Sequence, residues 1–280
     1  NVFFSVSNNH GAAVPDLSKD EFEVLENGRP QSTKYFAAKS DLPLTLGLLI
    51  DSSASMQRML GEEKVAGADF LRQSITKRDL AFIISFDVSV DLLQDLTSDL
   101  RLLRSGLGKA RINVGGGSSG IPGGGPVPVP RSHPKGTLLY DAVYLAAHDV
   151  LSQQVGRKVM VILTDGVDEG SKLKLRDAIE AAQKADGICY VLLLSDPQFR
   201  SDVSDMRQLT EQTGGRTIQV NRPDKIGEAF TQIANELRSQ YSLGYSPEND
   251  KRDGTFRKIE VKSKSGYKVQ ARKGYYAPAN

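Results

Sequence analysis

The chain has 280 residues, which is enough for one large α/β domain together with a small second unit. Apolar residues make up 39% and charged residues 25%, so the sequence can build a packed core and is not disordered as a whole. The 36 Lys and Arg nearly balance the 34 Asp and Glu, and so close a balance gives no electrostatic footprint for nucleic acid. The lack of Trp excludes a tryptophan-lined carbohydrate platform.

The single cysteine, Cys189, lies in an apolar run, and we expect it to be a small core residue. One cysteine cannot form an intrachain disulfide, and a lone thiol is more typical of a cytoplasmic or bacterial protein than of a disulfide-stapled secreted one. No apolar run reaches the ~20 residues that span a bilayer, so we expect no membrane insertion in this segment. The sequence shows no signal peptide, but it begins at Asn1 rather than Met and therefore says little about localisation.

The first 40 residues have the pattern of β structure. Apolar and polar residues alternate over residues 22–26, and Asn27-Gly28 follows as a strong hairpin signal. We expect residues 31–36 to return as the second strand.

The middle of the chain alternates between strand and helix patterns. Residues 44–50 are apolar without alternation, which is typical of a strand buried on both faces of a parallel sheet. Similar strands are predicted at 80–86, 158–164 and 188–194, with a hairpin partner at 88–93 and a short last strand at 217–220. Between them, apolar residues at helical spacing predict helices around Leu139, Ala142, Val143, Ala146 and Val150, around Leu175, Ala178, Ile179 and Ala182, and around Ile226, Phe230, Ile233 and Leu237. This order predicts a doubly wound, mostly parallel α/β sheet with helices on both faces.

Strand patterns return after Arg238, at residues 241–245, 256–261 and 267–271. Neither flank is large enough to be a stable sheet alone. We therefore expect residues 1–40 and 240–280 to form one small β subdomain, with an α/β domain of residues 41–239 inserted between its halves.

Residues 114–130 are rich in Gly and Pro and cannot form a helix or a central strand. We expect a surface loop. The alternative of a phosphate-cradling loop is disfavoured, because no Gly-Lys-Ser/Thr follows and no helix opens from the glycines.

Three polar segments follow predicted strands or precede a predicted helix, where open α/β sheets bind their ligands. They contain the five candidate metal-site residues Asp51, Ser53, Ser55, Thr137 and Asp165. These side chains offer only oxygen atoms, which suits Mg²⁺, with Mn²⁺ or Ca²⁺ as alternatives, and disfavours zinc and copper. Each residue alone could instead cap a helix or form a turn. Their occurrence together favours a metal site.

Asp51-Ser52-Ser53-Ala54-Ser55 resembles the Asp-x-Ser-x-Ser signature of von Willebrand factor A-type (VWA) domains, which are Rossmann-like. Thr137 and Asp165 match the two later positions of that family's metal-ion-dependent adhesion site. Residues 20–28, 241–245 and 274–278 also resemble the bacterial VWFA-related family first grouped from acidobacteria.

The resemblance implies a module for cell adhesion or other protein–protein interaction. Ser53 and Ser55 would bind the cation directly, Thr137 would do so when a ligand is engaged, and Asp51 and Asp165 would act mostly through water. The partner would be a protein that presents an acidic side chain to the metal. An extracytoplasmic or secreted location is favoured by the same resemblance.

A Mg²⁺-dependent phosphoryl-transfer enzyme is the rival interpretation, but no pair of nucleophile and base is visible. A haloacid-dehalogenase-type enzyme needs a second Asp where this chain has Ser53. Of the three histidines, His10 and His148 lie in other segments, and His133 is expected to be a solvated loop residue. We therefore predict a binding module rather than an enzyme, while a structural module with a purely stabilising metal remains open. We also expect Asp51 to be exposed, so that its replacement by Ala costs roughly a kcal/mol or less.

Overall fold

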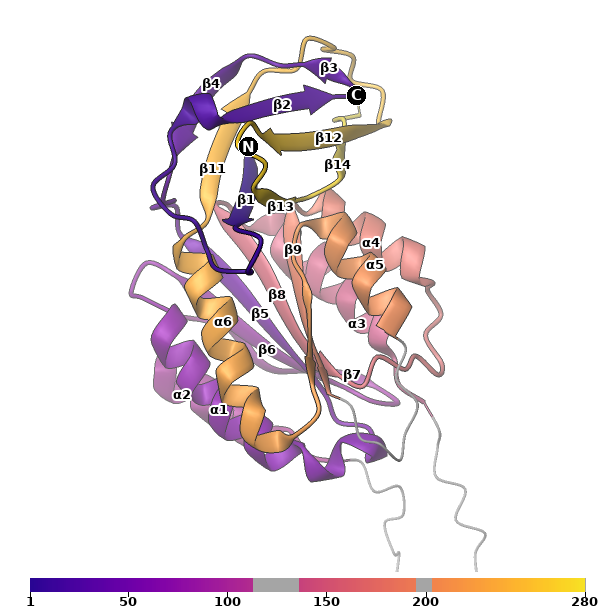
Figure 1. The fold of residues 1–280 in the computed structure, drawn as a ribbon. Coiled ribbons are helices and arrows are strands. Elements are labelled where there is room, and N and C mark those ends of the chain that lie inside the picture. The colour runs from indigo at the N-terminus through magenta and orange to yellow at the C-terminus, as the bar shows by residue number, and fades with distance from the viewer. Residues whose placement is uncertain (113–135, 195–202, 280) are drawn as a thin grey trace, which may run out of the picture.

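The structure, a computed structural model, describes residues 1–112, 136–194 and 203–279 (Figure 1). The predicted loop 114–130 and His133 lie outside these residues. The described strands are β1 (Val2–Ser7), β2 (Phe22–Glu26), β3 (Arg29–Pro30), β4 (Thr33–Ala37), β5 (Leu44–Asp51), β6 (Leu80–Phe86), β7 (Val90–Thr97), β8 (Arg157–Thr164), β9 (Gly187–Leu194), β10 (Thr217–Val220), β11 (Tyr241–Tyr245), β12 (Phe256–Ser263), β13 (Lys268–Ala271) and β14 (Gly274–Tyr276). The described α-helices are α1 (Leu60–Ser74), α2 (Leu100–Lys109), α3 (Leu139–Leu145), α4 (Leu175–Lys184), α5 (Val203–Thr213) and α6 (Ile226–Arg238).

Six strands form the central sheet in the order β10-β9-β8-β5-β6-β7, and all neighbours are parallel except β6 and β7. Strands β5 and β9 are buried along their whole length, as their unbroken apolar runs predict. Helices α1, α2 and α6 pack on one face of the sheet, and α3, α4 and α5 pack on the other. This arrangement confirms the predicted doubly wound, mostly parallel α/β fold.

The helix predicted from Leu139 onward changes its geometry along its length. The α-helical part α3 is continued by a π-helical turn, Ala146–Val150, and by a 3₁₀ turn, Leu151–Gln153. Its apolar face still packs on the sheet as predicted, because Ala142, Val143 and Ala146 are all buried.

Two further sheets, both antiparallel, are built from the ends of the chain. Their strand orders are β13-β1-β11-β4 and β14-β12-β2-β3, so each sheet combines strands from before and after the α/β body. A separate apolar core lies between them, with Phe4, Phe22 and Tyr241 in mutual ring contact. The strands of the two termini thus pair with each other, while the exact boundaries at residues 40 and 240 stay a prediction.

The Asn27-Gly28 turn has positive φ at both residues, 49° and 81°, as a tight hairpin turn requires. The strand predicted at residues 31–36 is present as β4, but its predicted pairing with β2 is wrong. Only Arg29 and Pro30 return beside β2, and the chain then crosses to the other sheet, where β4 pairs with β11. The Gln31 N–H still donates to the Val24 carbonyl at 2.8 Å, and beyond this bond the chain leaves β2.

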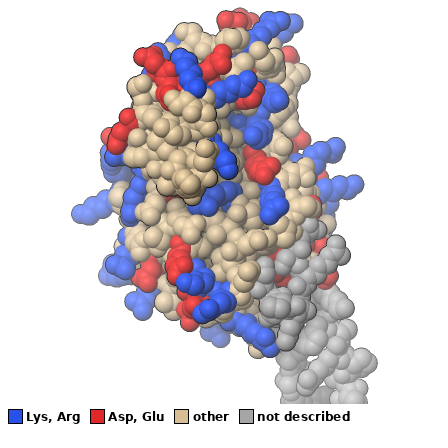
Figure 2. All heavy atoms as spheres, viewed as in Figure 1, with Lys and Arg blue, Asp and Glu red and all other residues tan. Residues whose placement is uncertain are grey.

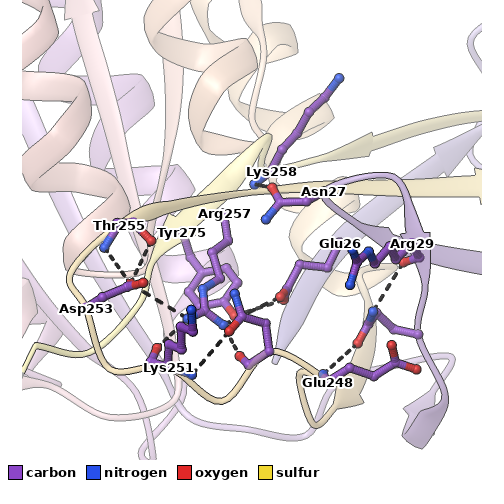
Figure 3. A network of polar contacts seen from close by, with 12 residues as sticks. Glu26, Asn27, Arg29, Glu248, Lys251, Asp253, Thr255, Arg257, Lys258 and Tyr275 are labelled. Carbon is purple, nitrogen blue, oxygen red and sulfur yellow. Dashed lines mark hydrogen bonds and ion pairs between the residues drawn. The ribbon is translucent and has the colours of Figure 1, made fainter.

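A buried ion pair ties the N-terminal strands to the C-terminal ones (Figure 3). The side chains of Glu26 on β2 and Arg257 on β12 are each 3% exposed and lie 3.7 Å apart. The hydroxyls of Tyr245 and Tyr275 donate to Glu26 Oε2 at 2.8 and 2.9 Å, and Arg257 donates to two carbonyls of the loop before β12. The network therefore joins segments more than 200 residues apart in the sequence.

The terminal sheets pack at the amino ends of the central strands, above the α/β body in Figure 1. Arg272 pairs with Asp186, the residue before β9, and Gln270 Nε2 donates to the Gly215 carbonyl at 2.6 Å. The carboxyl ends of the central strands therefore face away from the terminal sheets. Within the described residues, no helix is both long and apolar enough to cross a membrane.

Candidate metal centre

The carboxyl edge of the central sheet gathers the loops that carry the candidate residues. Strands β5 and β8 are parallel neighbours and end at Asp51 and Thr164, so the residues after them emerge side by side. The N–H of Leu138 donates to the Asp87 carbonyl at 2.8 Å, which brings the segment before α3 to the turn between β6 and β7. All three polar segments found in the sequence therefore reach the same edge.

Two serine hydroxyls lie next to each other at this edge. Ser53 Oγ and Ser55 Oγ are hydrogen-bonded at 3.0 Å, and the Ser55 hydroxyl is close enough to Asp165 to act on the pKa of that carboxyl group. Ser53 occupies the N-cap position of the 3₁₀ turn Ala54–Arg58, yet its side chain makes no capping hydrogen bond. Neighbouring oxygens in an octahedral shell with bonds of about 2.1 Å lie about 3.0 Å apart, so the pair has the spacing of two Mg²⁺ ligands.

Thr137 is held in place by its backbone. Its N–H and C=O pair with the C=O and N–H of Glu169 at 3.3 and 3.1 Å. The N-cap position of α3 belongs to Leu138, and the Thr137 hydroxyl has no hydrogen-bond partner among the described residues. Thr137 is only 7% exposed. Helix capping therefore does not explain why residues with a hydroxyl group stand at positions 53 and 137.

The two aspartates are buried and repel each other. Asp51 is 0% exposed; its Oδ1 accepts from the Ser53 N–H at 3.0 Å and its Oδ2 from the Thr164 hydroxyl at 2.7 Å. Burial, and then the charge of Asp165, raise the pKa of Asp51 to about 7. Burial also raises the pKa of Asp165, which accepts from the Val167 N–H at 3.0 Å. Our expectation of an exposed Asp51 is wrong, because the residue ends a strand that is covered on both faces.

A third acidic group, Glu63 on α1, lies near the aspartates. Its side chain is 0% exposed, and neither carboxylate oxygen has a hydrogen-bond partner in the described structure. Burial, and then the charge of Asp51, raise the pKa of Glu63 well above its usual range. Buried acidic groups whose pKa is raised by burial and by neighbouring negative charge form an environment that a cation would relieve. The residues present therefore fit a bound cation.

The hydroxyls are essential to this donor set. Residues 1–112, 136–194 and 203–279 contain no group of three or more His, Cys, Asp or Glu side chains placed to hold a metal. The described histidines do not join the site either, since His148 pairs with Asp149 at 2.7 Å on an exposed helix end and His10 lies in an exposed turn. A cation at this edge would have to bind hydroxyl oxygens.

Sequence reasoning missed two residues that shape the site. Thr164 accepts from the Gly166 N–H at 3.0 Å and donates to Asp51, so it orients that carboxyl group. Its signal is a polar residue that ends an apolar strand directly before Asp165. The signal for Glu63 is an acidic residue on the same helical face as Gly67 and Phe70, which are both buried.

The comparisons with known proteins concern the fold. Neither a family model nor a curated protein matches this sequence. Solved structures do match. The protein BatB from Bacteroides thetaiotaomicron is 16% identical over 69% of this chain and 97% of that chain, with a TM-score of 0.54. The von Willebrand factor type A protein from Catenulispora acidiphila is 12% identical over 93% of this chain and 74% of its own, with a TM-score of 0.55.

A third similar structure is proximal thread matrix protein 1 from the mussel byssus, 11% identical over 75% of this chain but 49% of that chain, with a TM-score of 0.57. Another structure of that protein has zinc in its MIDAS motif and a TM-score of 0.51 to this chain. At such low identities the similarity shows the fold alone. The α/β body of this chain has the fold of a VWA-type domain.

Proposed function

We propose that the VWA-type domain binds one divalent cation at the carboxyl edge of its central sheet and uses it to hold an acidic group of a partner protein. Ser53, Ser55 and Thr137 would supply direct oxygen ligands, with Asp51 and Asp165 acting mostly through water. The observation that carries the proposal is the pair of serine hydroxyls 3.0 Å apart beside two buried carboxyl groups of raised pKa.

The charge of the ligands explains why the partner should be acidic. Hydroxyl ligands are neutral, so the positive charge of the cation would be only partly offset by the atoms that touch it. A Glu or Asp side chain from a partner would complete both the coordination shell and the charge balance. The bound cation would in turn relieve the repulsion that raises the pKa of Asp51.

The donor chemistry favours Mg²⁺, with Mn²⁺ a close substitute and Ca²⁺ an alternative. Hydroxyl, carboxylate and water oxygens suit these hard cations, and the five candidate residues include neither a thiolate nor an imidazole. The mussel protein nevertheless holds zinc at its MIDAS motif, so zinc belongs in the same titrations.

Binding is favoured over catalysis because, among the described residues, Asp51 and Asp165 have no basic hydrogen-bond partner placed for proton transfer. Asp51 accepts from a serine N–H and a threonine hydroxyl, and Asp165 accepts from a backbone N–H. A phosphoryl-transfer enzyme would need a nucleophile or water activated by a base. A phosphatase screen with Mg²⁺ should therefore give no turnover; measurable turnover lost in Ser53→Ala would contradict the proposal.

Calorimetric titration of metal into EDTA-stripped protein tests the site. Ser53→Ala should lose metal binding, whereas Ser52→Ala should keep it, because the Ser52 hydroxyl bonds the Phe86 carbonyl and Asp87 instead. The two variants differ from the natural protein by the same atom at adjacent positions. Equal binding by both variants, or no binding to the natural protein up to millimolar metal, would contradict the metal site.

The partner is tested separately, by a pull-down from the native source with Mg²⁺ and with EDTA. A partner retained only with metal, and lost in Thr137→Ala, supports the binding function. If the metal raises the melting temperature but every captured partner binds equally in EDTA, the cation is purely structural and the proposed function fails.

A further inference from the structure

A second surface of the α/β body is suited to a partner, and it does not involve the metal edge. A groove of about 510 Å³ lies between α1 and α2, which pack side by side on the face of the sheet that they share with α6. Its floor contains Ala68 and Leu71 of α1 and Leu103 and Leu107 of α2. Leu71, Leu103 and Leu107 are each at most 1% exposed, so the floor is part of the domain core.

Apolar side chains also stand at the mouth of the groove. Val65 on α1 is 62% exposed and Leu100 on α2 is 37% exposed, and both line the groove. Burying such side chains against a partner removes apolar surface from water, which favours association. The groove thus offers an apolar floor together with apolar walls that nothing in the described structure covers.

The rim of the groove is strongly basic. Its charged lining residues are Lys64, Arg72, Arg101 and Arg104 against Asp69 alone, which gives 4 − 1 = +3. The whole chain carries only +2, and Lys and Arg are interspersed with Asp and Glu over the face drawn in Figure 2. The groove lining is therefore strongly positive, whereas acidic and basic residues nearly cancel in the rest of the protein.

Some of these basic side chains form ion pairs within the protein and others do not. Arg72 pairs with Asp69 at 3.0 Å, and Arg101 pairs with Asp99 at 3.0 Å. Lys64 and Arg104 form no ion pair with any described residue. An acidic partner would find Arg104, which has no ion pair in the described structure, and Lys64, whose charge acts on the buried Glu63, beside an apolar floor. A nucleic-acid backbone could satisfy the cations but would leave the apolar walls in water.

The length of the groove sets the shape of the partner. Lining residues extend from 64 to 72 on α1 and from 100 to 108 on α2, so each helix contributes about 12 Å, or roughly two turns. A third helix fits such a groove when its apolar residues recur at i, i+3, i+4 and i+7. We propose that the α1–α2 groove docks an acidic amphipathic helix of a partner protein.

Three synthetic helical peptides of about 15 residues test this proposal, with the full chain kept in EDTA so that the metal edge plays no part. The first peptide has Leu at i, i+3, i+4 and i+7 and Glu at all of its charged positions. The second keeps the Leu residues and replaces Glu with Lys, and the third keeps Glu and replaces Leu with Ser. Fluorescence anisotropy should show binding of the first peptide only, and NMR shifts should map to α1 and α2.

Variants of the groove complete the experiment. Arg104→Glu and Val65→Glu should each weaken binding of the first peptide at least about tenfold, because each places a negative charge against the acidic peptide. Both residues are exposed, so they can be replaced without a cost to the core. Arg207→Glu, an exposed arginine on α5, is the matched control and should bind like the natural protein, with circular dichroism melting verifying all three folds. Equal binding of the Glu and Lys peptides, shifts outside α1 and α2, or an unchanged affinity in Arg104→Glu would overturn the proposal.

Discussion

Replacing Asp51 by Asn should stabilise the metal-free protein while removing metal binding. Asn has nearly the same size as Asp and can still accept from the Ser53 N–H through its carbonyl oxygen. It carries no charge, so the burial penalty and the repulsion from Asp165 both disappear. The site would lose the carboxylate that supports the cation.

The magnitude follows from the raised pKa of Asp51. The difference between the ordinary pKa of an aspartate, 3.8, and the pKa of about 7 in the folded protein corresponds to about 4 kcal/mol of destabilisation once the carboxyl group is ionised. Against this, the Asn NH₂ group cannot accept from the Thr164 hydroxyl, which costs about 1 kcal/mol. Asp51→Asn should therefore raise the free energy of unfolding by up to about 3 kcal/mol at pH 8.

The dependence on pH distinguishes this explanation from a general packing effect. Because the folded-state pKa is raised, the folded metal-free protein keeps the proton on Asp51 between about pH 4 and pH 7, whereas the unfolded chain releases it. The natural protein should lose stability as pH rises through that window, and the variant should not. The difference in the free energy of unfolding between Asp51→Asn and the natural protein should be near zero at pH 4 and largest at pH 8.

Urea unfolding in EDTA at pH 4, 6 and 8 measures this difference for the natural protein and for Asp51→Asn. The reasoning is refuted if the variant is no more stable than the natural protein at pH 8, or if the difference between the two proteins does not change with pH.

Three further predictions follow from the same structure. Thr137→Ala should weaken partner binding more than metal binding, because its hydroxyl would join the metal only when a ligand is engaged; titration and pull-down showing equal losses would contradict this. Metal affinity should rise from about pH 5 to pH 7.5, because protons on Asp51 and Asp165 must leave; titrations in buffers of different ionisation enthalpy should detect released protons, and a flat pH profile would exclude the coupling. Arg257→Met should lower the free energy of unfolding by about 3–5 kcal/mol, because it leaves Glu26 buried without a counterion. In urea unfolding, the double variant with Glu26→Gln should recover part of this loss. No recovery would show that packing rather than charge holds the two strands together.

The sequence predicted the central sheet well because burial on both faces leaves a strong pattern. Residues 44–50 and 188–194 are unbroken apolar runs, and each corresponds to a strand buried along its whole length. The terminal strands were less predictable. The Asn27-Gly28 turn was recognised, but whether the chain after Pro30 stays beside β2 or crosses to β11 depends on packing between two sheets, which local pattern does not encode.

The candidate site shows the same division between local and long-range information. Spacing was sufficient to name five residues that reach one edge of the sheet. It did not reveal that Asp51 is fully buried or that Glu63 lies near it, because both facts depend on how α1 packs against the sheet. The electrostatic environment of a site is a property of the fold, while the donor atoms can be read from the chain.

Diffraction from crystals grown with Mn²⁺ tests the central claim most directly, because an anomalous difference map locates the cation without assuming its ligands. The proposed site requires one peak at the carboxyl edge of the central sheet, about 2.0–2.3 Å from the hydroxyl oxygens of Ser53 and Ser55. No peak at that edge under saturating Mn²⁺, or a peak bound only by other residues, would contradict it.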